Sequence, residues 1–115
     1  MLRRRGLPLA LAEIDLAKRA TLIDLDDPHV LGRERLRLSC VATRDRAVTQ
    51  PQALDLYHRH RDAAGLRWWS TWESLWANVT LFGRARPMLR VGTVSELTLE
   101  TPALVEAADL FALRI

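Results

Sequence analysis

All four tryptophans of the chain lie within residues 68–76, in the stretch GLRWWSTWESLWANVTLFGRA (65–85), and Ser70 lies among them. A serine hydroxyl donates or accepts a hydrogen bond, and an indole ring offers a flat apolar surface to a ligand. Proteins that mix helices and strands commonly bind ligands where strands end. The neighbourhood of Trp68, Trp69 and Ser70 is therefore the first candidate for a binding or catalytic site. Core packing is the alternative role, because most tryptophans are largely buried.

Two other groups of residues suggest chemistry but have simpler explanations. His58 and His60 are two residues apart in a predicted helix, so their side chains diverge, whereas ligands on one helix face are three or four residues apart. The aspartates of DLDDP (24–28) precede a proline and fit a helix-capping role. The run Arg3–Arg5 fits a solvated terminus. We predict no metal site.

Composition limits the class of protein. A chain of 115 residues is one small domain, and its 17 basic and 14 acidic residues are interspersed, so we expect no direct nucleic-acid binding. Cys40 is the single cysteine, which excludes an internal disulfide and favours a cytoplasmic protein. The N-terminus imitates a secretory signal, but Pro8 and the following acids argue against one. No apolar run is long enough for a membrane span.

The first half of the chain gives short and partly ambiguous elements. Residues 10–17 fit both a strand, through the alternation of Ala12, Ile14 and Leu16 with acids, and a helix. An apolar run at 20–25 precedes a predicted short helix at 28–34, capped by Asp26 or Asp27. Residues 38–43 indicate a loop or a weak strand.

The second half is clearer. Thr49 and Gln52 form a possible capping box for a helix that we expect Gly65 to end. Strands are predicted at 66–70, 77–82 and 88–94, and a last helix begins at Thr101-Pro102. In the strand 66–70 successive side chains face opposite ways, so both faces need contacts and the strand should be central. The predicted class is α/β (mixed α+β), with one small sheet of about four to five strands and two to three helices.

The order of these features resembles the C-terminal half of a RES domain, a toxin family named after an arginine, a glutamate and a serine. The similarity covers roughly residues 10–110, behind a basic segment 1–9. It rests on ATLIDLDDPHVL, on the Thr-Gln-Pro-Gln helix, on the aromatic strand that closes on Ser70 and on VTLFGRA. The resemblance implies an NAD-degrading enzyme with a fold related to ADP-ribosyltransferases, with NAD as substrate and no metal. Its partner would be an antitoxin that carries a DNA-binding domain.

Within this resemblance Ser70 matches the family serine and would be catalytic, while Arg67 and Trp69 would lie at the same NAD-binding pocket. The family arginine and glutamate precede the segment that resembles residues 10–25, and neither Glu13 nor Glu73 stands in the matching context. We therefore expect a truncated RES-type domain (10–115) that is inactive alone. The alternative is a non-enzymatic module that binds an antitoxin, another protein or a second copy through a tryptophan-rich face.

Overall fold

The computed structural model of the chain describes residues 2–71 and 75–114. Two compact units make up the chain. Leu16–Leu89 forms the larger unit, and the smaller one brings residues up to Asp15 together with those from Arg90 onward. The predicted mixed α+β class is confirmed, although the described strands form three small sheets instead of one.

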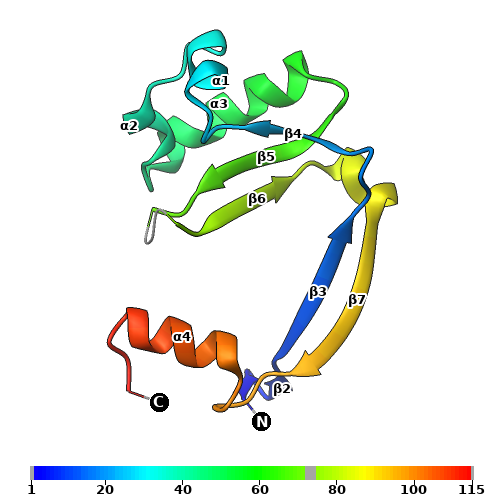
Figure 1. The fold of residues 1–115 in the computed structure, drawn as a ribbon, viewed down its shortest axis with the longest axis vertical. Helices are drawn as coiled ribbons and strands as arrows, with labels where there is room; N and C mark the ends of the chain where they lie inside the picture. Colours follow the sequence, from blue (N-terminus) through cyan, green and yellow to red (C-terminus); the bar gives the residue numbers. More distant parts are fainter. Residues whose placement is uncertain (1, 72–74, 115) are drawn as a thin grey trace. The chain divides into compact units, whose positions relative to one another are not determined.

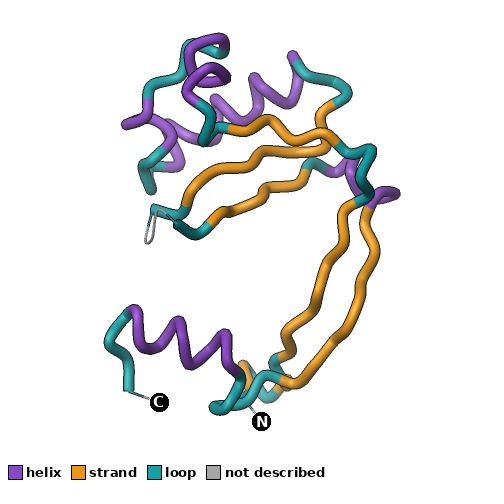
Figure 2. Tube along the Cα trace, in the orientation of Figure 1, coloured by secondary structure: helices purple, strands orange, loops and turns teal. Residues whose placement is uncertain are grey.

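Helices and strands follow one another along the chain as shown in Figures 1 and 2. In order they are β1 (Arg3–Arg4), β2 (Leu7–Pro8), β3 (Ala10–Leu16), β4 (Thr21–Asp24), α1 (Pro28–Arg33), α2 (Leu38–Val41), α3 (Arg46–Arg59), β5 (Ala63–Trp69), β6 (Ala77–Leu81), the 3₁₀ helix η1 (Gly83–Met88), β7 (Leu89–Glu96) and α4 (Pro102–Leu110). The predicted strands at 66–70, 77–82 and 88–94 are confirmed within two residues at most ends, and residues 10–17 form a strand.

The larger unit is built on the sheet β4–β5–β6. Strand β5 lies in the middle, parallel to β4 and antiparallel to β6, which confirms its predicted central position. Ile23 and Thr80 are the two neighbours of Leu66 across the sheet, so these three side chains share one face. Helices α1, α2 and α3 lie over that face (Figure 1).

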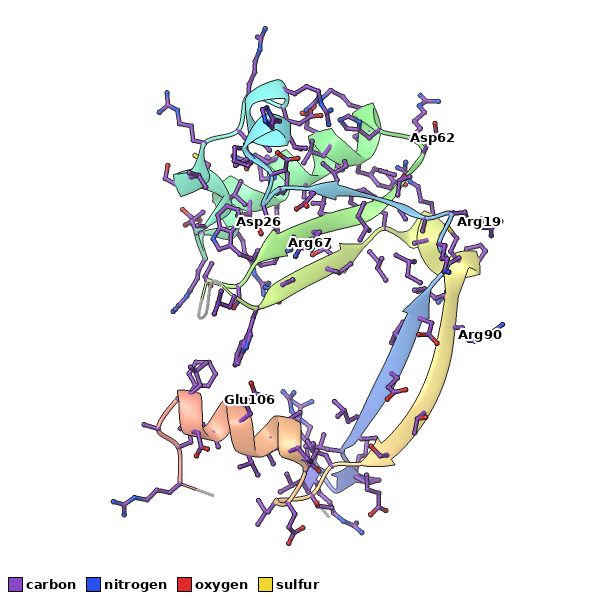
Figure 3. The ribbon with its side chains drawn as sticks, in the orientation of Figure 1. Arg19, Asp26, Asp62, Arg67, Arg90 and Glu106 are labelled. Atoms are coloured by element: carbon purple, nitrogen blue, oxygen red, sulfur yellow. The ribbon has the colours of Figure 1, made fainter. Side chains whose placement is uncertain are left out.

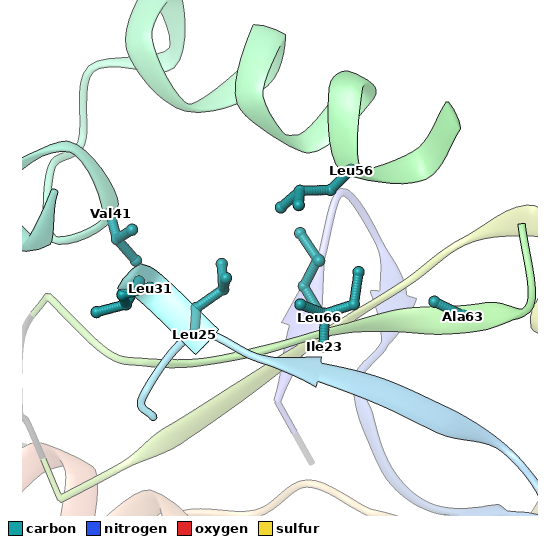
Figure 4. Packing of buried hydrophobic residues seen from close by; sticks show 7 residues of the cluster. All are labelled: Ile23, Leu25, Leu31, Val41, Leu56, Ala63 and Leu66. Atoms are coloured by element: carbon teal, nitrogen blue, oxygen red, sulfur yellow. The ribbon is translucent and has the colours of Figure 1, made fainter. Parts of the chain in front are cut away.

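The core of the larger unit forms between the three helices and the sheet (Figure 4). Apolar side chains from every covering helix meet those of β4 and β5 there, because each element has one apolar face to bury. The buried cluster consists of Ile23, Leu25, Leu31, Val41, Leu56, Ala63 and Leu66. Trp68 and Trp69 are partly buried and pack against it, in agreement with a core role for both indoles.

The start of α3 differs from the prediction. Asp45, not Thr49, is the N-cap residue, and its carboxylate accepts a hydrogen bond of 3.0 Å from the Ala47 N–H. The helix therefore begins one turn earlier than the capping box suggested and carries Pro51 inside it. The prediction was wrong because the pattern of a capping box at Thr49 and Gln52 also fits the inside of a helix that Asp45 caps one turn earlier.

The end of α3 also differs from the prediction. The helix ends with His60 as its C-cap, and the Arg84 guanidinium donates to the Tyr57 and His60 carbonyls at 2.7 and 2.9 Å. Gly65 does not end the helix but lies inside β5. A Cβ atom on Gly65 would collide with the Thr80 carbonyl oxygen, so this glycine permits close approach of β6.

Of the remaining helices, α1 and α4 were predicted from the sequence and α2 was not. Asp27 caps α1 as predicted, with its carboxylate accepting from the His29 N–H at 2.8 Å, and α4 begins at Pro102. The expectation of a loop or weak strand at 38–43 was wrong, because Leu38–Val41 is one turn of helix. Its Val41 side chain joins the buried cluster.

The smaller unit contains the hairpin β1–β2, the ribbon β3–β7 and α4. Arg5 and Gly6 form the hairpin turn with positive φ angles of 52° and 79°, as two-residue hairpin turns require. The described part of the basic segment, residues 2–9, therefore contains a hairpin. Strands β3 and β7 run antiparallel (Figure 1), and nearly all of their side chains are exposed.

Candidate functional site

A cavity of about 590 Å³ lies in the larger unit, between α2, the first half of α3 and the helix-covered face of the sheet. This volume is within the range of small-molecule sites. The apolar part of its lining comes from the core and from Trp68. The residues of this part are Leu25, Leu36, Val41, Ala53, Leu56, Leu66 and Trp68.

The rest of the cavity lining is polar and includes two cations. Thr43, Arg44 and Arg46 come from the connection between α2 and α3, and Thr71 and Thr80 come from the sheet side. No described lining residue carries a carboxylate. The described lining thus combines an apolar wall with a positively charged one, which suits an anionic ligand that also carries a flat apolar group.

Trp68 is fixed within this cavity wall. Its indole Nε1–H donates a hydrogen bond of 3.1 Å to the Thr80 hydroxyl on the neighbouring strand β6. The bond links two lining residues and holds the orientation of the ring. A flat ligand group would therefore meet a pre-oriented indole.

Ser70, the predicted catalytic residue, follows β5 immediately and is only 7% exposed. Its backbone N–H donates to the Trp76 carbonyl at 2.8 Å, which closes the connection between β5 and β6. Trp68, two residues before it, and Thr71, directly after it, line the cavity, whereas Ser70 itself does not. Ser70 is thus a buried serine at a strand end beside a cavity.

The alternation of the strand places Arg67, one of the two predicted NAD-binding residues, on the other face of β5. Trp69, the second, packs against the core cluster. The Arg67 guanidinium lies 3.2 Å from the Asp24 carboxylate and 3.5 Å from that of Asp26 (Figure 3). Neither Arg67 nor Trp69 lines the cavity. In the structure these two residues therefore do not form part of the described cavity lining.

Glu34 is the buried carboxylate of the described residues, with a side chain that is 2% exposed. Arg59 Nη1 lies 2.7 Å from one carboxylate oxygen, and His60 Nε2 lies 2.8 Å from the other, at an angle unsuited to a hydrogen bond. Burial alone raises the pKa of the Glu34 carboxyl, but the hydrogen bond from Arg59 and the proximity of the Arg59 and His60 side chains outweigh it and hold the pKa below its ordinary value. This carboxylate joins α1 to the end of α3.

Sequence reasoning missed Arg44 and Arg46 as site residues. The sequence TRDR (43–46) contained a usable signal, because Asp45 is a good N-cap residue and a helix N-terminus favours anions. Glu73 and Trp72, from the tryptophan stretch, are outside the described residues. Within residues 2–71 and 75–114, no group of three or more metal-binding side chains is arranged around a common point.

Comparisons with protein-family models, with curated proteins and with solved structures give no match to this chain. In the described part of the chain, every helix is too short or too polar to cross a membrane.

Proposed function

We propose that the chain carries the serine side of an NAD site and belongs to an NAD-degrading enzyme of the RES type. The observation that carries this proposal is the position of Ser70, which is buried directly after β5 and precedes Thr71, a residue that lines the 590 Å³ cavity; Ser70 itself is beside this lining and not part of it. The resemblance seen in the sequence assigns the catalytic serine to the same residue. The two arguments are independent, because the resemblance uses no information about the cavity.

The cavity lining supports NAD as the ligand. NAD has two flat rings joined through a diphosphate, and the cavity offers an indole and two arginines. Arg44 and Arg46 would bind the diphosphate, because guanidinium groups pair with phosphate oxygens. Trp68 would contact one of the rings. Arg67, which lies against Asp24 and Asp26, does not line the cavity.

The reaction breaks the bond between ribose C1′ and the nicotinamide nitrogen. The electron pair of that bond leaves with nicotinamide, and C1′ develops the positive charge of an oxocarbenium ion. Water or phosphate then adds its oxygen at C1′, and an attacking water also releases a proton. Ser70 would orient the nicotinamide ribose through its hydroxyl, which both donates and accepts.

Stabilising this cation requires a carboxylate beside C1′. Glu34 is unsuited to that role, because Arg59 and His60 already neutralise it and it does not line the cavity. We therefore propose that the 115-residue chain binds NAD without degrading it, because no described lining residue carries a carboxylate.

The test combines calorimetric binding of NAD with measurement of nicotinamide release by the full chain. We expect binding without release, and binding about tenfold weaker in Arg46→Ala, the loss expected for one charged contact. Arg19→Ala is the matched control, because Arg19 is equally exposed but lies outside the cavity. Absence of binding in a folded chain would refute the NAD site. Nicotinamide release that Ser70→Ala abolishes would support the site and refute the claim of inactivity.

A protein-binding module is the second candidate, favoured by the open face of the larger sheet. Val79 is 50% exposed, on the same face as Arg67, and Leu75 is 90% exposed in the β5–β6 connection. Apolar side chains that a protein exposes can be buried at an interface with a partner. This alternative predicts that the wild-type chain does not bind NAD and co-purifies with an antitoxin. The Val79→Asp variant should no longer co-purify with that antitoxin.

A further inference from the structure

The ribbon β3–β7 in the smaller unit has two free edges. Within residues 2–71 and 75–114, each of these strands has the other as its single hydrogen-bonded neighbour. Apolar side chains on both strands are exposed, including Ile14 (53%), Val91 (62%) and Val94 (58%). Two strands without a further strand or a covering helix are at best marginally stable in water. The ribbon is therefore suited to pairing with another strand.

The hydrogen-bonding pattern between β3 and β7 indicates which backbone groups of β7 point away from β3. The Ala17 N–H donates to the Met88 carbonyl at 2.9 Å, and Gly92 lies against the Glu13 side chain and carbonyl on the neighbouring strand. Hydrogen-bonded and non-bonded pairs alternate along an antiparallel pair. Around Gly92 the even-numbered residues of β7 therefore face β3, and the N–H and C=O groups of residues 91, 93 and 95 point away. This alternation applies to the middle of β7, because the Leu89 N–H donates to the Arg86 carbonyl and the Leu97 N–H donates to the Leu9 carbonyl.

We propose that β7 pairs antiparallel with β7 of a second copy of this chain, with the two-fold axis at Thr93. This register overlaps all residues from 90 to 96 and uses the outward-pointing groups. It also places Arg90 opposite Glu96 of the second copy. Because of the two-fold symmetry, the dimer contains two such pairs. Opposite charges on directly facing residues stabilise a strand pair. The resulting sheet has the order β3–β7–β7–β3.

The β3 edge is unsuited to the same pairing. The register that overlaps all of Ala10–Leu16 with a second copy sets Glu13 opposite Glu13, and a shift toward the C-terminal end sets Glu13 opposite Asp15. Like charges that face each other destabilise a strand pair. Charge therefore disfavours the register with the longest overlap at the β3 edge and favours the corresponding register at the β7 edge.

The test is the dimer dissociation constant of the full chain, measured by sedimentation equilibrium at low salt. We expect a dimer in the micromolar to millimolar range. Arg90→Glu and Glu96→Arg should each raise the dissociation constant about tenfold, because two attractive pairs become repulsive. The double variant R90E/E96R should restore the wild-type value. Glu100→Arg, an exposed charge reversal outside the strand, is the matched control.

A second pair of variants tests the edge without changing charge. Thr93→Pro removes an N–H that points to the second copy and should abolish the dimer, whereas Ile14→Pro on the outer edge of β3 should leave it intact. Circular dichroism checks that each variant is folded. A wild-type chain that stays monomeric at millimolar concentration would overturn the proposal. So would a dimer that survives Thr93→Pro, or single reversals that the double variant does not rescue.

Discussion

Replacement of Gly65 by alanine tests the packing of the sheet that forms one wall of the cavity. The added Cβ atom would collide with the Thr80 carbonyl oxygen and lie 3.0 Å from Leu81 Cα. Both contacts are with the backbone of β6, so no side-chain rotation relieves them. The strands β5 and β6 must separate locally, or β5 must rotate.

The cost follows from two effects. Overpacking of this kind destabilises by about 1–3 kcal/mol, and stretching one or two hydrogen bonds of the β5–β6 ladder adds about 0.5–1.5 kcal/mol each. Alanine also lowers the conformational entropy of the unfolded chain, which stabilises the folded state by about 0.4–1 kcal/mol and offsets part of this loss. We expect a net loss of about 2–4 kcal/mol, which lowers Tm by roughly 10 °C in a domain of this size.

Urea denaturation followed by tryptophan fluorescence measures this loss, because all four tryptophans lie at 68–76 in the larger unit. Gly32→Ala is the matched control. Gly32 lies in α1 with open space where its Cβ would stand, so the same substitution should stabilise by up to about 1 kcal/mol. Equal stability of Gly65→Ala and wild type, or equal losses in the two variants, would refute the reasoning.

Three further substitutions test local features of the larger unit. Because the pKa of Glu34 is lowered in the folded state, its ion pairs stabilise the fold in full at pH values above the ordinary pKa of 4.5. This stabilisation is lost as the pH falls through the lower pKa of the folded state. The urea midpoints of Glu34→Gln and wild type should therefore differ at neutral pH and converge in acid. Arg84→Lys keeps the charge but cannot hold both carbonyls at the end of α3, so thermal unfolding should show a loss of about 1–2 kcal/mol. Pro51→Ala restores an N–H that can donate to the Ala47 carbonyl inside α3, and thermal unfolding should show a gain of about 1–3 kcal/mol; a loss of stability would contradict this account of the helix.

The strands were predictable where one periodicity dominated. Residues 77–82 alternate between apolar and polar types and form β6, whereas residues 10–17 fit both periods and needed the structure to identify β3. Gly65 illustrates a different limit. Glycine is favoured at the end of a helix and also where a neighbouring strand comes close, because a Cβ atom is sterically disfavoured in both places. The sequence alone does not distinguish these two roles.

The candidate site was only partly predictable. Ser70 was singled out because it ends the predicted strand 66–70 within the tryptophan stretch, and its role in a site stays a prediction. Arg44 and Arg46 line the cavity because α2 and the early start of α3 carry the connecting segment there. One turn of helix is too short for a periodic signal, so tertiary packing decides its conformation. The cavity depends on that turn and was therefore not visible in the sequence.

The central claim is that the cavity beside Ser70 binds NAD, and an NMR titration of the ¹⁵N-labelled chain with NAD tests it most directly. We predict saturable shifts of the Trp68 indole signal and of the Arg46 and Thr71 amides, which belong to lining residues. The Val79 amide on the open face should not move. Absence of shifts at millimolar NAD, or shifts confined to the open face, would contradict the account.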